Sequence, residues 1–137
     1  MNYVLDTNAC IALINDKPAW ARAHFNKALR DGSHFFVSSV TAFELWYGVA
    51  KSTRPEFNRQ RVAMFFSGPV QLLPFEAEDA EIGGGIRAEL EVRGKPVGPY
   101  DILIAAQAIN RSLTLVTADT SEFGRLKNLS LANWAKP

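Results

Sequence analysis

The clearest indication of the fold is the segment Tyr3-Val4-Leu5-Asp6-Thr7-Asn8, in which a short apolar run ends at an acidic residue and hydroxyl and amide side chains follow. Residues 3–5 predict a buried strand, and the apolar positions within 9–14 predict a short helix after it. A second buried strand is expected at 35–37, a third short strand at 70–73, a fourth strand at 113–116 and a small one at 129–131. Since these strands are continuous apolar runs rather than alternating ones, they are typical of a parallel sheet covered on both faces.

The segments between the predicted strands have helical spacing. Helices are expected at 18–30, with Pro18 as first residue, at 43–50, from Pro55 to near Ser67, at 77–92 and at 101–110, with a helical turn near Phe123. This alternation predicts an α/β fold with a mostly parallel central sheet of four to five strands, flanked by helices on both faces. The 137 residues suit a single domain spanning 1–137.

Composition narrows the function classes. A net charge of +1 excludes a generally basic nucleic-acid coat but leaves room for a local basic patch. With one cysteine and two histidines, the chain has neither an intrachain disulfide nor a Cys/His zinc cluster. No signal peptide is recognisable, and no apolar run approaches the ~18 residues that a membrane span needs. We therefore expect a cytoplasmic protein with no membrane partner.

Four acidic residues lie where a predicted strand ends or a predicted helix begins: Asp6, Glu44, Asp101 and Asp119. In an open α/β sheet the ligand site lies beyond the carboxyl ends of the strands, and all four side chains can reach that edge. Carboxylates repel one another, so a cluster of them calls for a counter-charge. The usual counter-charge for oxygen ligands is a hard divalent cation such as Mg²⁺ or Mn²⁺.

Each acid also has a structural interpretation. Asp6 and Asp101 are natural helix caps, and Asp119 suits an Asx turn. Glu44 lies inside an amphipathic helix, where capping does not explain it, although a solvent-facing position would. Because all four acids are expected at the same edge of one sheet, a shared site is favoured over four separate structural roles.

The motifs around these acids resemble those of a known family. Leu5-Asp6-Thr7-Asn8 and Ser38-Ser39-Val40-Thr41, with Phe43-Glu44-Leu45 and Gly48, are similar to the first half of a PIN domain. Ile86-Arg87-Ala88-Glu89-Leu90, Gly94-Lys95-Pro96 and residues 101–106 are similar to its third motif, and residues 115–119 with Glu122-Phe123 to its last. The match spans nearly the whole chain in order, and it resembles most the VapC-type toxins of bacterial toxin–antitoxin systems.

The resemblance implies an endoribonuclease that uses Mg²⁺, or Mn²⁺ in its place, to hydrolyse RNA with a metal-activated water. Asp6, Glu44, Asp101 and Asp119 would be catalytic and would bind the metal. Thr7, Asn8, Ser38 and Thr117 would hydrogen-bond behind them. The resemblance also implies a homodimer and a cognate VapB-type antitoxin that places a basic side chain near the acidic pocket. The expected substrate is a tRNA, with Gly98-Pro99 before Asp101 suggesting the anticodon loop of initiator tRNA.

Cations near these motifs are candidates for RNA binding. Lys51 and Arg54 lie in the predicted helical hairpin, and Arg87 and Lys95 flank the approach to Asp101. Such side chains can hold backbone phosphates, or can simply form a solvated helix face. Among the aromatic residues, Trp46 and Tyr47 suit either base stacking or, as we favour, a partner interface or core.

Two other interpretations remain. A catalytically silent PIN-like module would bind RNA or protein without cutting, but such relatives usually lack one or more acids, and here none is missing. A phospho-acceptor or phosphatase domain often carries a second aspartate two residues after the first, whereas this chain has Asn8 there.

Overall fold

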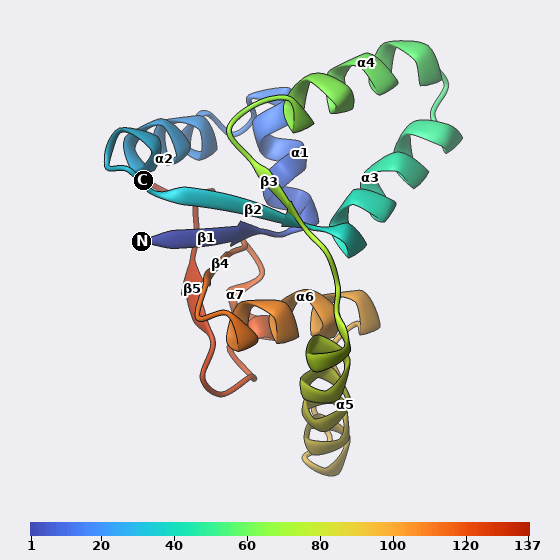
Figure 1. The fold of residues 1–137 in the computed structure, drawn as a ribbon, viewed down its shortest axis with the longest axis vertical. Coiled ribbons are helices and arrows are strands. Elements are labelled where there is room, and N and C mark those ends of the chain that lie inside the picture. Colours follow the sequence, from blue (N-terminus) through green and yellow to red (C-terminus); the bar gives the residue numbers. More distant parts are fainter.

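An all-parallel sheet of five strands forms the centre of the computed structural model, which describes residues 1–137. The strand order is β3-β2-β1-β4-β5 (Figure 1). The strands are β1 (Asn2–Leu5), β2 (His34–Ser38), β3 (Gln71–Leu73), β4 (Thr114–Val116) and β5 (Ser130–Ala132). The predicted parallel sheet of four to five strands is confirmed.

Seven helices cover the two faces of this sheet. Figure 1 shows α1 to α4 on one side and α5 to α7 on the other. The first group is α1 (Thr7–Asn15), α2 (Ala19–Arg30), α3 (Ser39–Lys51) and α4 (Pro55–Phe66). The second is α5 (Ala77–Val92), α6 (Pro99–Asn110) and α7 (Thr120–Phe123). No helix combines the length and the apolar character needed to cross a membrane.

The buried side chains form two cores, one on each side of the sheet. Leu5 and Phe35 belong to the core under α1 to α4, whereas their strand neighbours Val4 and Phe36 belong to or pack against the core under α5 and α6. Successive side chains of a strand point to opposite faces, so a strand buried on both sides must be apolar throughout. This explains the continuous apolar runs in the sequence.

The order of the strands places a crevice beside β1. The chain moves outward from β1 through β2 to β3, then returns through α5 and α6 to the other side of β1, where β4 and β5 follow. In doubly wound sheets, ligands bind at such a reversal, outside the carboxyl ends of the strands. Asp6 follows β1, and the segment from Thr117 to Asp119 follows β4.

Several predicted boundaries shift in the structure. Pro18 is the residue before α2 rather than its first member. Helix α3 starts at Ser39, earlier than predicted, because Ser38 ends β2 and its Oγ accepts a hydrogen bond of 3.0 Å from Val40 N. Of the glycines at 83–85, only Gly83 packs closely, with Ala106 Cβ 3.6 Å from where a Cβ would lie.

A buried ion pair fastens α5 to the end of α6. Asp79 is fully buried and accepts hydrogen bonds from both terminal nitrogens of Arg111, with Nη2 at 3.1 Å from Oδ2. It also accepts from Asn110 Nδ2 at 2.9 Å and from Glu76 N at 2.8 Å. Burial alone would raise the pKa of Asp79, but these hydrogen bonds outweigh it and hold the pKa below its usual value.

Candidate active site

Asp6 is the most deeply buried of the four predicted acids, with 6% of its surface exposed. Its Oδ1 accepts a hydrogen bond of 2.7 Å from Ala9 N, so it does cap α1. Burial raises the pKa of Asp6; hydrogen bonds from the Thr117 side chain and Ala9 N oppose this, while the charges of Asp119 and Glu44 add to it. The helix-cap role therefore explains the contact of Asp6 with Ala9, but not its burial or the nearby charges of Asp119 and Glu44.

Glu44 comes from α3 and reaches the start of α1. The Thr7 hydroxyl donates to Glu44 Oε1 at 2.6 Å, although the two residues are 37 positions apart. Glu44 is half-buried rather than fully solvent-facing. Because Thr7 follows Asp6 directly, this hydrogen bond keeps the Glu44 carboxylate beside Asp6.

Asp101 is the third residue of α6, so the prediction that it caps this helix is wrong: Gly98 occupies the cap position. The pKa of Asp101 is raised to about 6. Burial is the main cause, followed by the negative charges of Glu122, Asp6, Glu44 and Asp119. The other three predicted acids therefore all lie near enough to Asp101 to affect its ionisation.

Asp119 is the most exposed member of the group and caps the short helix α7, where its Oδ1 accepts from Glu122 N at 3.2 Å. Its own backbone N–H donates to Thr117 Oγ1 at 2.9 Å. Thr117 therefore accepts from Asp119 and hydrogen-bonds Asp6, which ties the ends of β1 and β4 together.

Glu122 is a fifth acid to which the sequence assigned no role. Its Oε1 accepts a hydrogen bond of 2.9 Å from Gly98 N, the residue that begins α6. Among the charges that act on Asp101, that of Glu122 raises the pKa most. In the sequence, Glu122 is recognisable only as an acid three residues after Asp119, a spacing that by itself suggests a helix cap.

The charge on this carboxylate cluster, which we define as Asp6, Glu44, Asp101, Asp119 and Glu122, is not balanced by the protein. None of the five takes part in an ion pair with a lysine or arginine. An oxygen-only, uncompensated donor set fits a hard divalent cation. No three His, Cys, Asp or Glu side chains converge enough to hold an ion by themselves, so water would complete the ligand set.

The other predicted polar residues differ in their placement. Thr7 and Thr117 hydrogen-bond to members of the carboxylate cluster. Ser38 is buried and makes its hydrogen bond to Val40 N, so it fixes the start of α3 rather than an acid. Asn8 is exposed, and its side chain makes no hydrogen bond within the protein.

The candidate RNA-binding cations are all exposed, and three of them contact other side chains. Lys51 Nζ lies 4.8 Å from the ring centre of Tyr47, and the Arg54 guanidinium lies 4.1 Å from that of Phe57. Arg87 pairs with Glu91 at 3.2 Å. Lys95 forms neither an ion pair nor a contact with an aromatic ring, so of the four it is the most available to bind a phosphate.

The two aromatic candidates on α3 have different surroundings. Trp46 is half-buried, stacks on Phe66 with ring centres 6.0 Å apart and lies under Arg59. It is therefore part of the packing between α3 and α4. Tyr47 is 58% exposed, and Phe43 on the same helix is 57% exposed.

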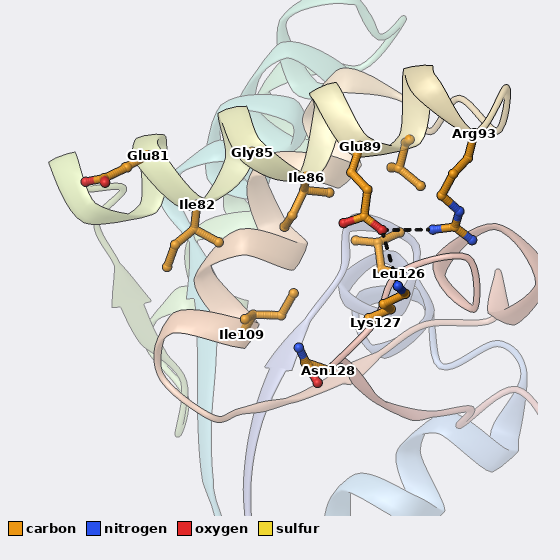
Figure 2. A pocket seen from close by; sticks show the side chains of 11 residues that line it. Glu81, Ile82, Gly85, Ile86, Glu89, Arg93, Ile109, Leu126, Lys127 and Asn128 are labelled. Atoms are coloured by element: carbon orange, nitrogen blue, oxygen red, sulfur yellow. Dashed lines mark hydrogen bonds and ion pairs between the residues drawn. The ribbon is translucent and has the colours of Figure 1, made fainter.

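Cavities are found both near and away from the carboxylate cluster. Figure 2 shows one of about 550 Å³ between α5 and the segment after α7, which none of the five carboxylates lines. Its walls carry Ile82 and Ile86, and Glu89 there is paired with Arg93 at 3.4 Å and Lys127 at 3.8 Å (Figure 2). A groove of about 270 Å³ between α1, α3 and α4 does include Glu44.

Comparison with protein families and known proteins gives one consistent result. A family model described as PIN domain matches residues 3–129. The chain is 43% identical over 135 residues to the tRNA(fMet)-specific endonuclease VapC of Shigella flexneri, covering 98% of this chain and 99% of the relative. It is 38% identical over 138 residues to Ribonuclease VapC2 of Rickettsia felis, covering 99% and 100%.

Solved structures agree. A chain of VapBC2 from Rickettsia felis, in a crystal structure bound to a DNA fragment from its promoter, superposes with a TM-score of 0.91 at 36% identity, covering 98% of this chain and 99% of that one. A chain of DNA-bound VapBC from Salmonella typhimurium gives 0.89 at 40% identity, covering 98% of each.

Proposed function

The chain belongs to the PIN domain family and is a VapC-type endoribonuclease, and on that premise we propose that its carboxylate cluster cleaves a tRNA with the help of Mg²⁺ or Mn²⁺. The observation that carries the proposal is the proximity of Asp6, Glu44 and Asp119 to Asp101, whose pKa each of them raises, with no protein cation to balance these charges. VapC nucleases of this family are generally metal-dependent. The choice of Mg²⁺ or Mn²⁺ rests on the oxygen-only donor set.

The protein contributes fixed positions for its carboxylates. Ala9 N and Thr117 hold the Asp6 carboxylate, and Thr7 holds that of Glu44. Such hydrogen bonds orient metal ligands, and their removal commonly costs ~10- to 100-fold in affinity or activity. The ion, when bound, supplies positive charge for the attacked phosphate and lowers the pKa of water.

Asp101 and Glu122 set how the site responds to protons. With a pKa of about 6, Asp101 holds a proton in part of the molecules near neutral pH. A bound cation would need the ionised form of Asp101, so this carboxyl group would give up its proton when the site fills. Glu122 fixes the Gly98 turn and keeps a negative charge near Asp101.

The proposed substrate is initiator tRNA, cut in its anticodon loop. Relatives in Shigella flexneri and Salmonella typhimurium are named tRNA(fMet)-specific endonucleases, at 43% and 40% identity. A loop of unpaired bases suits an enzyme that must reach single phosphates. We place the protein in the cytoplasm, where it would meet this RNA, and treat residues 1–137 as one domain.

We further propose that a VapB-type antitoxin covers this nuclease. The solved relatives are VapBC complexes. The groove of about 270 Å³ between α1, α3 and α4 includes Glu44, and the exposed Phe43 and Tyr47 lie on the same helix. An antitoxin seated there can bring a guanidinium to the uncompensated acids. A homodimer remains a prediction from the family resemblance.

The test is cleavage-site mapping on total bacterial RNA incubated with the purified protein and Mg²⁺. We expect new 5′ ends at one position in the anticodon loop of initiator tRNA, and none after chelation with EDTA. New ends scattered over many RNAs would contradict the substrate assignment. RNA binding without cleavage in any divalent metal would instead support the catalytically silent module.

A further inference from the structure

A third cavity, of about 200 Å³, lies beside the carboxylate cluster and has no assigned role. Ala9 and Thr117 line it, and both also hydrogen-bond Asp6: Ala9 through its backbone N–H at 2.7 Å and Thr117 through its side chain. The two sites thus share a wall, and a molecule in this cavity would lie next to the proposed point of cleavage.

Most of the residues that line this cavity are apolar. They include Ala12 of α1, Ala21 of α2 and the indole of Trp134 from the C-terminal segment. The volume is below the ~300–1,000 Å³ typical of sites for drug-sized ligands. A small, mostly apolar space of this size suits one flat ring, as in enzymes that take an unstacked base into a pocket.

Two uncommitted polar side chains stand among the lining residues. Asn8 is exposed and its carboxamide, which has both donors and an acceptor, is free of protein hydrogen bonds. Lys17 takes part in no ion pair, because the neighbouring Asp16 is paired with Arg22 at 3.0 Å. An amide can read the edge of a base, and a free ammonium can hold a backbone phosphate.

We propose that this cavity receives one unstacked nucleobase of the RNA, adjacent to the phosphate that is cleaved. Asn8 contacts the edge of that base, Ala12, Ala21 and the small accessible part of Trp134 line the space around it, and Lys17 holds a neighbouring phosphate. The inference rests on the proposed ribonuclease function and adds a determinant of sequence preference to it. It also gives Asn8 a role in substrate contact rather than in support of the acids.

The test uses a set of short RNAs that contain the mapped cleavage site and carry a single abasic nucleotide at successive positions. For the wild-type protein, one abasic position should lower kcat/KM by about 10- to 100-fold, comparable to the loss of one base contact in proteins that bind single strands. Ala12→Phe fills the cavity and should lower kcat/KM on intact RNA by a similar factor, with no further loss at that position. Ala23→Phe, at an exposed site on α2 outside the cavity, is the matched control.

Two additional measurements keep the result interpretable if Ala12→Phe folds poorly or no cleavage is seen. Asn8→Ala, at an exposed position, should weaken the preference among the four bases at the abasic-sensitive nucleotide. Binding of the same RNAs to the Asp101→Asn protein, followed by fluorescence anisotropy, should show the same sensitive position. Absence of cleavage by wild type would count against the proposed function, whereas the binding series judges the cavity.

The proposal is overturned if no abasic position is more sensitive than the others, or if Ala12→Phe responds to the abasic series as wild type does. An unchanged RNA series combined with weaker antitoxin binding by Ala12→Phe would assign the cavity to the partner protein and would also overturn it.

Discussion

The substitution Glu122→Gln tests how the charge of one carboxylate in the cluster affects the ionisation of Asp101. Glutamine keeps an oxygen that can accept the hydrogen bond from Gly98 N, which Glu122 Oε1 now accepts at 2.9 Å. The substitution removes the negative charge that raises the pKa of Asp101 most among its neighbours. The start of α6 should therefore stay in place while Asp101 ionises more easily.

The size of the effect follows from the distance between the two carboxylates. A Cβ on Gly98 would lie 3.4 Å from Asp101 Oδ2 and 3.8 Å from Glu122 Oε1, so these oxygens are at most about 7 Å apart. Two unit charges at about 7 Å interact by roughly 0.6 kcal/mol in water and roughly 2.4 kcal/mol at an effective dielectric constant near 20. Removing one charge should lower the pKa of Asp101 by about one unit.

The assay is the pH dependence of RNA cleavage at a fixed, subsaturating Mg²⁺ concentration. With the pKa of Asp101 at about 6, wild-type activity should fall as pH drops below 6, because protonated Asp101 binds cations poorly. In Glu122→Gln this decline should begin about one pH unit lower, which gives about fivefold more ionised Asp101 at pH 5. Only the position of the decline is compared, since the lost charge also weakens cation attraction at every pH.

Glu81→Gln, an exposed carboxylate on α5, serves as the control and should leave the profile unchanged. A decline that stays in place in Glu122→Gln, or moves to higher pH, would refute the coupling between Glu122 and Asp101.

Three further substitutions test other parts of the structure. Asp79→Ala should lower the free energy of unfolding in urea by about 3 kcal/mol, because it removes the fully buried carboxylate of the pair and leaves the half-buried Arg111 with only the exposed Glu76 carboxylate at 3.8 Å, whereas Glu78→Ala at an exposed position should have little effect. The pKa of Asp79 is lower in the folded than in the unfolded protein, so its ionisation stabilises the fold fully above the unfolded pKa. This stabilisation should disappear as the pH falls through the folded pKa, and the difference in unfolding free energy between wild type and Asp79→Ala should therefore become smaller in acid. Thr7→Val removes the 2.6 Å hydrogen bond to Glu44 and should weaken Mn²⁺ binding, measured calorimetrically, by ~10-fold or more; unchanged affinity would exclude this role. Gly84→Ala should raise the free energy of unfolding by ~1 kcal/mol, since a Cβ there meets open space, and a loss of stability would show that the glycine has a contact in solution.

The fold was predictable because its signals are local. Apolar runs such as those of β1 and β2 mark central strands, and five strands alternating with helical segments leave few arrangements other than a covered parallel sheet. Boundaries were less accurate, as at α3, where capping by Ser38 starts the helix several residues before its apolar face begins.

Contacts between distant residues were not predictable in the same way. The Asp79–Arg111 pair joins residues 32 positions apart, and no spacing rule indicates it. The role of Glu122 beside Asp101 depends on how α7 packs against the Gly98 turn. In the sequence, Lys51 and Arg54 look like cations without a contact, whereas in the structure both lie over aromatic rings of their own helical hairpin.

Asp6 is the residue on which the proposed metal-dependent nuclease centre depends most directly. The decisive measurement is single-turnover cleavage of purified initiator tRNA by wild type and Asp6→Asn, each with Mg²⁺ and with EDTA. Asparagine is as good a helix cap as aspartate, so the variant should keep the cap on α1 and unfold at a similar urea concentration. We expect cleavage only by wild type with Mg²⁺; cleavage in EDTA, or by folded Asp6→Asn at the wild-type rate, would contradict the account.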